Sequence, residues 1–278
     1  VYDNNFKKDY IRNLLVKFSI PLIPIINKNK KIVNVITWSN FFKDESKNKT
    51  LEIPVVIMAG GRGTRLKPFT NILPKPLMPI NEQTMLDIII KDLKSYGLHK
   101  IFLTVNYKSE IIKSYLKEMN YENNIKCLYE KEPLGTAGGL KLLPKKLNQK
   151  TYLVTNCDIL TKVNYEDLIN FHKKNKNEIT LITSNKKYTL PYGVYKKDKK
   201  GKFEEIIEKP SHNYIVNIGI YVIEKKCLEL IPKSKKFDMT DLIKKIDKKK
   251  LKIGNYSIND KNWQDIGNWN EFSKLKIN

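Results

Sequence analysis

A glycine-rich turn holds two of the three arginines of this 278-residue chain. The segment VVIMAGGRGTRL, residues 55–66, places Arg62 and Arg65 directly after an apolar run that is typical of a buried strand. Glycine lets the backbone approach a phosphate closely, and a guanidinium group binds phosphate oxygens in a fixed, forked geometry. These residues therefore predict a binding site for a polyphosphate.

A proline-rich segment, LPKPLMPI at residues 73–80, follows this turn and contains Lys75. The turn has neither the spacing of a Walker A loop nor the third glycine of the dinucleotide-binding fingerprint. Taken together, however, the pattern GGxGTRLxP and the downstream PKPLxPI closely resemble the sugar-1-phosphate nucleotidyltransferases. The resemblance extends over residues 53–278, because further motifs of that family follow in the expected order.

The resemblance implies roles for both segments and for a later loop. Arg65 would hold the triphosphate and stabilise the departing pyrophosphate, and Lys75 would neutralise the phosphates around the reacting phosphorus. Arg62 occupies the variable position of the motif and is expected on the outer face of the turn. In EKEPLGTAG, residues 130–138, backbone groups would read the nucleobase. The expected nucleotide contacts are Ala59, Gly60, Gly61, Gly63, Thr64, Leu134, Gly135, Thr136 and Ala137.

Two aspartates are the expected ligands of Mg²⁺. Asp158 ends the segment YLVTNCD and Asp265 lies in WQDIGN, at the places where the family carries its metal-binding acids. Mg²⁺ prefers oxygen ligands and commonly takes one or two carboxylates together with substrate phosphates. Cys157 stands where the family usually has glycine. We expect it to be a small, semi-buried residue, and a redox-active thiol is the alternative.

Three later motifs, PYGV, EKP and VNIGIY, follow the order of the family's sugar-binding segments. By this resemblance, Lys209 would bind the sugar phosphate and act with Arg65 and Lys75 as a catalytic residue. The expected sugar contacts are Tyr192, Gly193, Glu208 and Asn217.

The implied reaction transfers a nucleoside monophosphate from an NTP to a sugar 1-phosphate and releases pyrophosphate. GTP is the favoured nucleotide, with thymidylyl transfer or another NTP specificity as the alternative, and the sugar is a hexose or hexosamine such as glucosamine. The preference for GTP comes from residues 20–38, whose pattern predicts two strands, 20–26 and 31–37, joined by a turn. This segment resembles the closing half of a CBS module. CBS pairs fused to this transferase type resemble guanylyltransferases of bacterial surface-sugar pathways such as that of legionaminic acid. An intact CBS pair would bind a nucleotide effector.

The alternative to an enzyme is a non-catalytic protein that senses a nucleotide.

The elements that carry these motifs alternate between strands and helices from residue 53 onward. Such alternation favours an α/β fold, here a Rossmann-like, mixed and mostly parallel sheet with helices on both faces. Ligands of such sheets bind at the carboxyl ends of strands, which is where the arginine turn lies. The expected domains are a small partial CBS-like segment at residues 1–45, a linker at 46–52 and a nucleotidyltransferase domain at 53–278. The expected strands are 53–59, 101–105, 125–129, 152–155, 179–183 and 216–223, and the expected helices are 38–42, 85–96, 109–119, 165–173, 240–248 and 268–275.

The net charge of +23 is spread along the chain as lysine. Arginines that read base edges are missing, so we expect no nucleic-acid partner, although the surface would attract anionic substrates. No apolar run approaches the roughly 20 residues that span a bilayer, so no membrane partner is expected. Three cysteines and three histidines show no metal-site spacing, and the cysteine count argues for a reducing, cytoplasmic location. The pattern leaves formation of a homo-oligomer open.

Overall fold

The computed structural model describes residues 10–11, 13–15, 20, 22–37, 51–233 and 235–273. The helix expected at 38–42 and most of the expected linker lie outside these residues.

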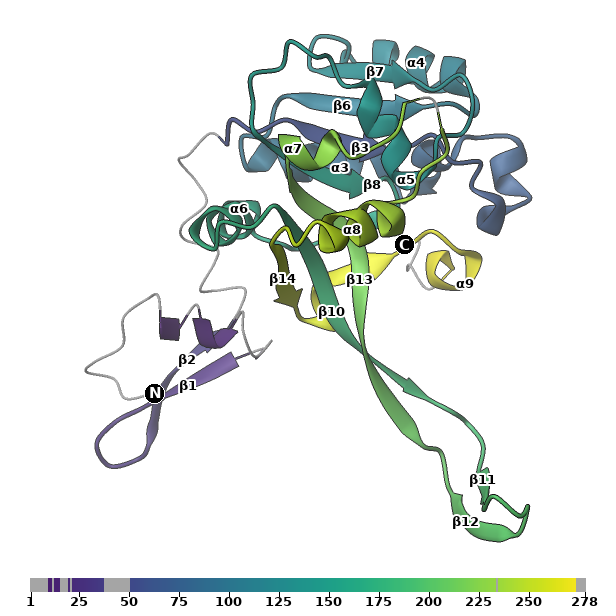
Figure 1. Ribbon diagram of the computed structural model, residues 1–278. Coiled ribbons are helices and arrows are strands. Elements are labelled where there is room, and N and C mark those ends of the chain that lie inside the picture. Colours follow the sequence, from purple (N-terminus) through teal and green to yellow (C-terminus); the bar gives the residue numbers. More distant parts are fainter. Residues whose placement is uncertain are drawn as a thin grey trace.

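A seven-stranded sheet forms the centre of the molecule, with the strand order β14-β10-β13-β8-β3-β6-β7 (Figure 1). Neighbouring strands are parallel except where β13 is involved, since β13 runs antiparallel to both β10 and β8. The prediction of a mixed, mostly parallel sheet is confirmed. In chain order the strands are β3 (Val55–Met58), β6 (Ile101–Val105), β7 (Ile125–Tyr129), β8 (Thr151–Asn156), β10 (Ile179–Thr189), β13 (Ser211–Glu224) and β14 (Ile253–Ile258).

Helices cover both faces of this sheet, as predicted. Alternate residues of a strand point to opposite faces. On β3, Val55 and Ile57 accordingly pack into a hydrophobic cluster with α3, α4 and α6, whereas Val56 and Met58 pack into a second cluster with α5, α7 and α8. The α-helices of the described chain after β3 are α3 (Met85–Ser95), α4 (Ser109–Glu118), α5 (Gly135–Gly138), α6 (Tyr165–Lys174), α7 (Lys225–Leu228), α8 (Met239–Lys248) and α9 (Trp269–Phe272), of which α9 packs in a third, separate cluster.

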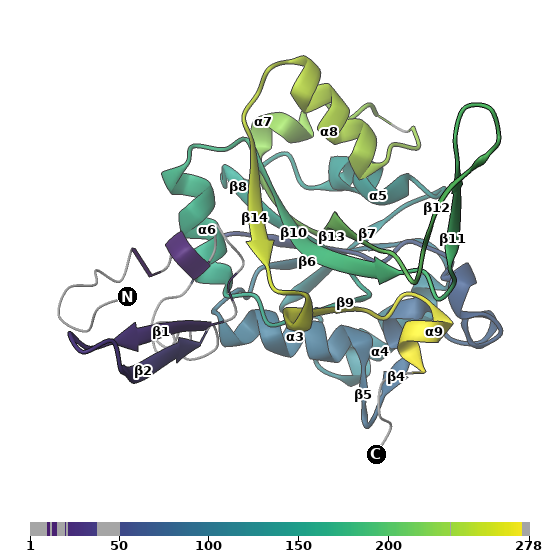
Figure 2. The same cartoon turned by 90° about the horizontal axis from the view of Figure 1, so that it is seen from below.

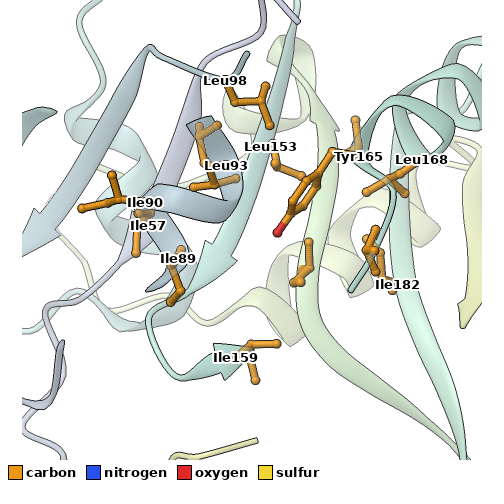
Figure 3. Close-up of a cluster of buried hydrophobic side chains, with 14 of the residues drawn as sticks. Ile57, Ile89, Ile90, Leu93, Leu98, Leu153, Ile159, Tyr165, Leu168 and Ile182 are labelled. Carbon is orange, nitrogen blue, oxygen red and sulfur yellow. The ribbon is translucent and has the colours of Figure 1, made fainter. Parts of the chain in front are cut away.

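The first cluster holds the central strands in place (Figure 3). Ile57 of β3 and Leu153 of β8 lie among Ile89 and Leu93 of α3 and Leu168 of α6, and all five side chains are buried. Complete burial of one such side chain contributes about 1.5–3 kcal/mol. Because β3 and β8 are fixed in this way, the loops that follow their carboxyl ends start from rigid positions.

A two-stranded arm projects from this body (Figures 1 and 2). β10 and β13 stay paired out to Thr189 and Ser211, whereas the third strand, β14, ends opposite Ser184. The sequence predicted only the inner parts of β10 and β13, because their outer parts contain no apolar run. In the following text, residues 185–216 are called the arm. The hairpin at its tip consists of β11 (Val194–Lys197) and β12 (Phe203–Ile207).

Near the N-terminus, β1 (Leu22–Ile26) and β2 (Ile32–Thr37) form an antiparallel hairpin. Ile23 and Ile25 of this hairpin are buried and belong to the first hydrophobic cluster. The expected pair of strands is thus present, and its relation to a CBS module stays a prediction. Within the described part of the chain, no helix has the length and apolar character needed to cross a membrane.

Candidate active site

A cavity of about 320 Å³ lies at the carboxyl ends of the parallel strands β3, β6 and β8. This is the place that the strand-and-turn pattern predicts. The predicted residues that line the cavity are Gly60, Gly61, Gly63, Thr64, Arg65, Lys75, Gly135, Thr136 and Asp158.

The glycine-rich turn after β3 forms one wall of this cavity. Gly63 has a φ of +63°, and a Cβ at this position would lie 2.9 Å from Thr70 Cγ2 and 3.0 Å from Lys75 Cβ. Thr70 Oγ1 donates a hydrogen bond of 2.9 Å to the carbonyl of Gly63, which fixes the turn. Glycine is therefore required at Gly63 by both its backbone conformation and the space available. Ala59 is buried below the turn, where its amide donates to Thr104, so its side chain does not line the cavity.

Two cationic side chains of this loop meet one carboxylate. Lys75 is buried, and its Nζ contacts Asp158 Oδ2. Arg65 Nη2 lies 3.9 Å from the same oxygen, while 63% of the Arg65 side chain is exposed. A buried ammonium group needs such a partner because desolvating an unpaired charge is costly. Arg62 is exposed and does not line the cavity, consistent with its expected place on the outer face of the turn.

Asp265 lies beside Asp158 because of a short strand pair that the sequence did not predict. β15 (Trp263–Asp265) pairs antiparallel with β9 (Ile159–Thr161), so that Asp265 lies opposite Ile159, the residue after Asp158. The amide of Ile266 then donates a 3.0 Å hydrogen bond to the carbonyl of Asp158. The two aspartates that were expected to act together are therefore neighbours in the fold.

Gly267 leaves the space between these charged groups open. A Cβ at this position would overlap Asp158 Oδ2 and would lie 2.7 Å from Lys75 Nζ and 2.8 Å from Asp265 Oδ1. Both carboxylates thus point at one small volume. Among the described residues, no group of three His, Cys, Asp or Glu side chains could hold a metal ion by itself. Two carboxylates that leave the other positions to water and phosphate fit the ligand preference of Mg²⁺.

The loop expected to read the nucleobase is tied to the residues that precede α8. The amides of Ala137 and Gly138 both donate to the carbonyl of Phe237, at 3.0 and 2.9 Å. The amide of Thr136 donates to Asp238 Oδ1 at 3.1 Å. These donors are already used within the protein, and the side chain of Ala137 is buried. Gly135 and Thr136 are the predicted residues of this loop that line the cavity, and the base-reading role of the loop stays a prediction.

Glu130 is a further acidic group in the cavity, between the glycine turn and the base loop. It is buried, and its Oε2 accepts a 2.9 Å hydrogen bond from the amide of Leu134. Burial raises the pKa of this carboxyl above its usual value, and the hydrogen bonds from Leu134 and Thr104 oppose that rise. A Cβ at Gly60 would lie 2.9 Å from Glu130 Oε1. The glycine at this position lets the turn lie close against the carboxylate.

The predicted sugar-binding residues lie outside the cavity. Tyr192, Gly193, Glu208 and Lys209 are all on the arm, and among the described residues that line the cavity none comes from the arm. Asn217 lies at the base of the arm, where its Oδ1 accepts a 3.1 Å hydrogen bond from the amide of Gly219. The roles expected for these residues stay predictions.

Comparison with known proteins identifies the family to which this site belongs. The family model described as nucleotidyl transferase matches residues 54–277. The chain belongs to the nucleotidyl transferase family. The first three motifs and the cavity that they form lie within this match, so the resemblance seen in the sequence is confirmed at the level of the family.

Relatives of this nucleotidyl transferase include two fungal mannose-1-phosphate guanyltransferases. The protein of Yarrowia lipolytica is 36% identical over 183 residues, which cover 63% of this chain and 50% of the relative. That of Pichia angusta is 33% identical over 229 residues, covering 78% and 61%. The chain thus spans between half and two thirds of these relatives. Among solved structures, HddC from Yersinia pseudotuberculosis has a TM-score of 0.63 and 27% identity over 80% of this chain and 97% of HddC.

Several residues of this nucleotidyl transferase site were missed by the sequence reasoning. Glu130, Asn156 and Lys236 line the cavity, and Gly267 shapes the space between the aspartates. Glu130 and Gly267 stand inside motifs that the sequence singled out, so a search for polar or glycine positions within those motifs could have found them.

Cys157 is buried, and burial together with the neighbouring Asp158 raises its pKa to about 12. The thiol is therefore protonated at neutral pH, which supports the interpretation as a small buried residue.

Proposed function

We propose that this nucleotidyl transferase moves the guanylyl group of GTP onto a sugar 1-phosphate and releases pyrophosphate. The observation that carries the proposal is the meeting of Arg65, Lys75 and Asp158 in the cavity, with Asp265 directly beside Asp158. Two cations and two carboxylates at the carboxyl ends of parallel strands suit a reaction between phosphates. The phosphate oxygen of the sugar attacks the α-phosphorus of GTP and forms the new P–O bond. The bond from that phosphorus to the bridging oxygen breaks, and its electron pair leaves with pyrophosphate.

The residues of the site would neutralise the charge of the reacting phosphates and hold them in position. A phosphate monoester is already ionised at neutral pH, so the attacking oxygen needs no base to remove a proton. Arg65, being largely exposed beside Asp158, would bind the leaving phosphates, and Lys75 would turn from Asp158 toward the α-phosphate. Mg²⁺ bound between Asp158 and Asp265 would supply further charge neutralisation on the phosphate oxygens. Removal of one such preorganised group commonly costs about 10²–10³ in rate.

Glu130 supports guanine as the base. A carboxylate only accepts hydrogen bonds, and guanine presents donors at N1 and N2 along one edge, whereas thymine and uracil offer a single donor between two carbonyls. The carboxylate lies next to the base loop and lines the cavity. The names of the guanyltransferase relatives and the structure of HddC with GMP-PN agree with this choice.

A substrate panel tests the proposal directly. The protein is incubated with Mg²⁺, one of GTP, dTTP, UTP or CTP, and one of mannose 1-phosphate, glucose 1-phosphate or glucosamine 1-phosphate. We expect pyrophosphate release with GTP and one of these sugars. We also expect Arg65→Ala and Lys75→Ala to lose at least about 100-fold in kcat while retaining the wild-type circular dichroism spectrum. Tight GTP binding without turnover on any sugar would instead favour the nucleotide-sensing alternative, and near-normal rates for both variants would refute the catalytic roles.

A further inference from the structure

A short segment, residues 67–73, lies between the arginine and the lysine that meet at Asp158, and in the following text it is called the connecting segment. All of its residues are described, and Thr70 is the only one of them that is buried. Phe69 stacks on Trp269 with the ring centroids 5.1 Å apart, but both rings remain partly exposed. A segment with so few buried apolar contacts keeps one conformation only where other contacts hold it. The positions of the two cations therefore depend on what binds the connecting segment.

Two residues that follow β6 bind the connecting segment. Tyr107 Oη donates a 3.0 Å hydrogen bond to the carbonyl of Thr70. Lys108 Nζ donates a 2.9 Å hydrogen bond to the carbonyl of Ile72. Lys108 Nζ also lies 5.5 Å from the centre of the Tyr107 ring, within the range of a cation–π contact. Every residue of β6 is buried, so both hydrogen bonds hold the segment against a rigid part of the fold.

Thr70 transmits the contact with Tyr107 to the glycine-rich turn. The hydroxyl of Thr70 donates to the carbonyl of Gly63 at 2.9 Å, while its own carbonyl accepts from Tyr107. A Cβ at Gly63 would lie within contact distance of both Thr70 and Lys75, so these three residues pack together. The hydrogen bond from Tyr107 therefore bears on the glycine-rich turn and on the base of the Lys75 side chain at the same time.

The end of β6 also holds Glu130, on the other side of the cavity. The amide of Glu130 donates to the carbonyl of Val105 at 2.9 Å, and Asn106 Nδ2 donates to the carbonyl of Glu130 at 2.7 Å. The backbone of Glu130 is thus fixed independently of the connecting segment. Residues 105–108 anchor both sides of the cavity, and the hydroxyl of Tyr107 serves the side that carries the cations.

We propose that Tyr107 is a positioning residue for nucleotidyl transfer. Through Thr70, its hydroxyl holds the connecting segment so that Arg65 and Lys75 meet the phosphates in the geometry of the reaction. This inference rests on the proposed function, because Arg65 and Lys75 act there on the phosphates of GTP. Tyr107 is not among the residues that line the cavity, so it acts through the segment and touches no reacting atom.

Steady-state kinetics of Tyr107→Phe test this role. The change removes the hydroxyl and keeps the ring that Lys108 contacts. Loss of one hydrogen bond shifts a local equilibrium by about fivefold, so kcat should fall by about that factor. KM for GTP should stay at the wild-type value, because the anchoring of Glu130 is unchanged. A role in stability alone would lower the thermal unfolding midpoint and leave kcat of the folded protein unaltered.

Tyr129→Phe is the matched control, since it removes the same hydroxyl from an exposed tyrosine of the edge strand β7. This control should keep the wild-type kcat. A Tyr107→Phe enzyme with the wild-type kcat would overturn the proposal, and so would one in which only KM for GTP changes.

A double-mutant cycle tests the path through Thr70. Thr70→Val keeps the shape of the side chain beside Gly63 and removes the hydroxyl that donates to the Gly63 carbonyl. Because Tyr107→Phe and Thr70→Val release the same turn, each should lower kcat about fivefold and the double variant should lose little more. A double variant that loses the product of the two effects, about 25-fold, would show that the hydroxyls act independently and would overturn this path.

Hydrogen exchange decides the positioning role without any substrate. The amides of residues 71–73 are hydrogen-bonded within the connecting segment, to the carbonyls of Pro68 and Phe69. In Tyr107→Phe, peptides that contain these amides should exchange about fivefold faster, whereas those of α3 should be unchanged. Equal exchange in the variant and the wild type would overturn the proposal. A wild-type protein that is inactive on the whole substrate panel would refute the proposed function, and the exchange result would still show whether Tyr107 holds the segment.

Discussion

Replacement of Gly267 by alanine should damage the site while leaving the fold intact. The added methyl group would enter the space that Asp158, Lys75 and Asp265 share. Gly267 is not among the residues with positive φ, so alanine can adopt its backbone conformation and the effect comes from the Cβ alone. The adjacent Ile266 remains buried, which keeps the segment anchored in its hydrophobic cluster.

The size of the effect follows from the contacts. Non-bonded carbon atoms reach their best separation at about 3.5–4.0 Å. The new Cβ would lie 2.7 Å from Lys75 Nζ and 2.8 Å from Asp265 Oδ1 and would overlap Asp158 Oδ2, so these groups must move by about an ångström. A displacement of about 1 Å at reacting groups can cost roughly 100-fold in rate. We therefore expect Gly267→Ala to lower kcat about 100-fold and to raise the Mg²⁺ concentration needed for half-maximal rate.

Pyrophosphate release at saturating GTP and sugar 1-phosphate, measured over a Mg²⁺ titration, checks this expectation. Asn270→Ala is the matched control, since Asn270 is exposed three residues further along. Both variants should have the thermal unfolding midpoint of the wild type within a few degrees. A Gly267→Ala enzyme with an unchanged kcat and an unchanged Mg²⁺ requirement would show that these three charged groups do not act at the reaction centre.

Three further predictions concern residues around the site and in the core. Asp238→Ala removes the acceptor for the Thr136 amide, so KM for GTP should rise about tenfold with little change in kcat, as steady-state kinetics would show. Cys157, with its pKa raised to about 12, should resist iodoacetamide at pH 8 in the folded protein and react in urea, as mass spectrometry would report. Burial raises the pKa of Asp92 from 3.8 to about 6, so the folded state binds this proton more tightly and loses stability as pH rises through that range. Asp92→Asn should therefore add up to about 3 kcal/mol to the free energy of unfolding above pH 6 and little below pH 4, as urea titrations at both pH values would show.

Local patterns were enough to predict six of the seven strands of the central sheet, and β14 was missed. The runs at 101–105 and 125–129 coincide with β6 and β7. Every residue of β6 is buried, as expected of a central parallel strand, whereas the edge strand β7 exposes Lys126 and Tyr129. The start of α3 was also predictable, since Thr84 and Asp87 form a capping box with side chains that are close in sequence. These features depend on neighbouring residues, which a single sequence displays.

Features that depend on distant pairing could not be predicted in this way. Asp265 meets Asp158 only because β15 pairs with β9 in one register, and neither strand has an apolar run that would reveal it. The hydrogen bonds from the base loop to Phe237 join segments about a hundred residues apart. The resemblance to a family supplied the pairing of the two aspartates, whereas the length of the arm and the use of the loop amides emerged only from the fold.

The most direct test of the central claim is the release of pyrophosphate from GTP in the presence of Mg²⁺ and a sugar 1-phosphate, with Arg65→Ala and Lys75→Ala measured alongside the wild type. The account predicts that pyrophosphate and a GDP-sugar appear in equal amounts, that dTTP, UTP and CTP are poor substitutes, and that both variants lose at least about 100-fold in rate. Equal turnover by the variants and the wild type, or the absence of pyrophosphate with every nucleotide and sugar 1-phosphate in the panel, would contradict it.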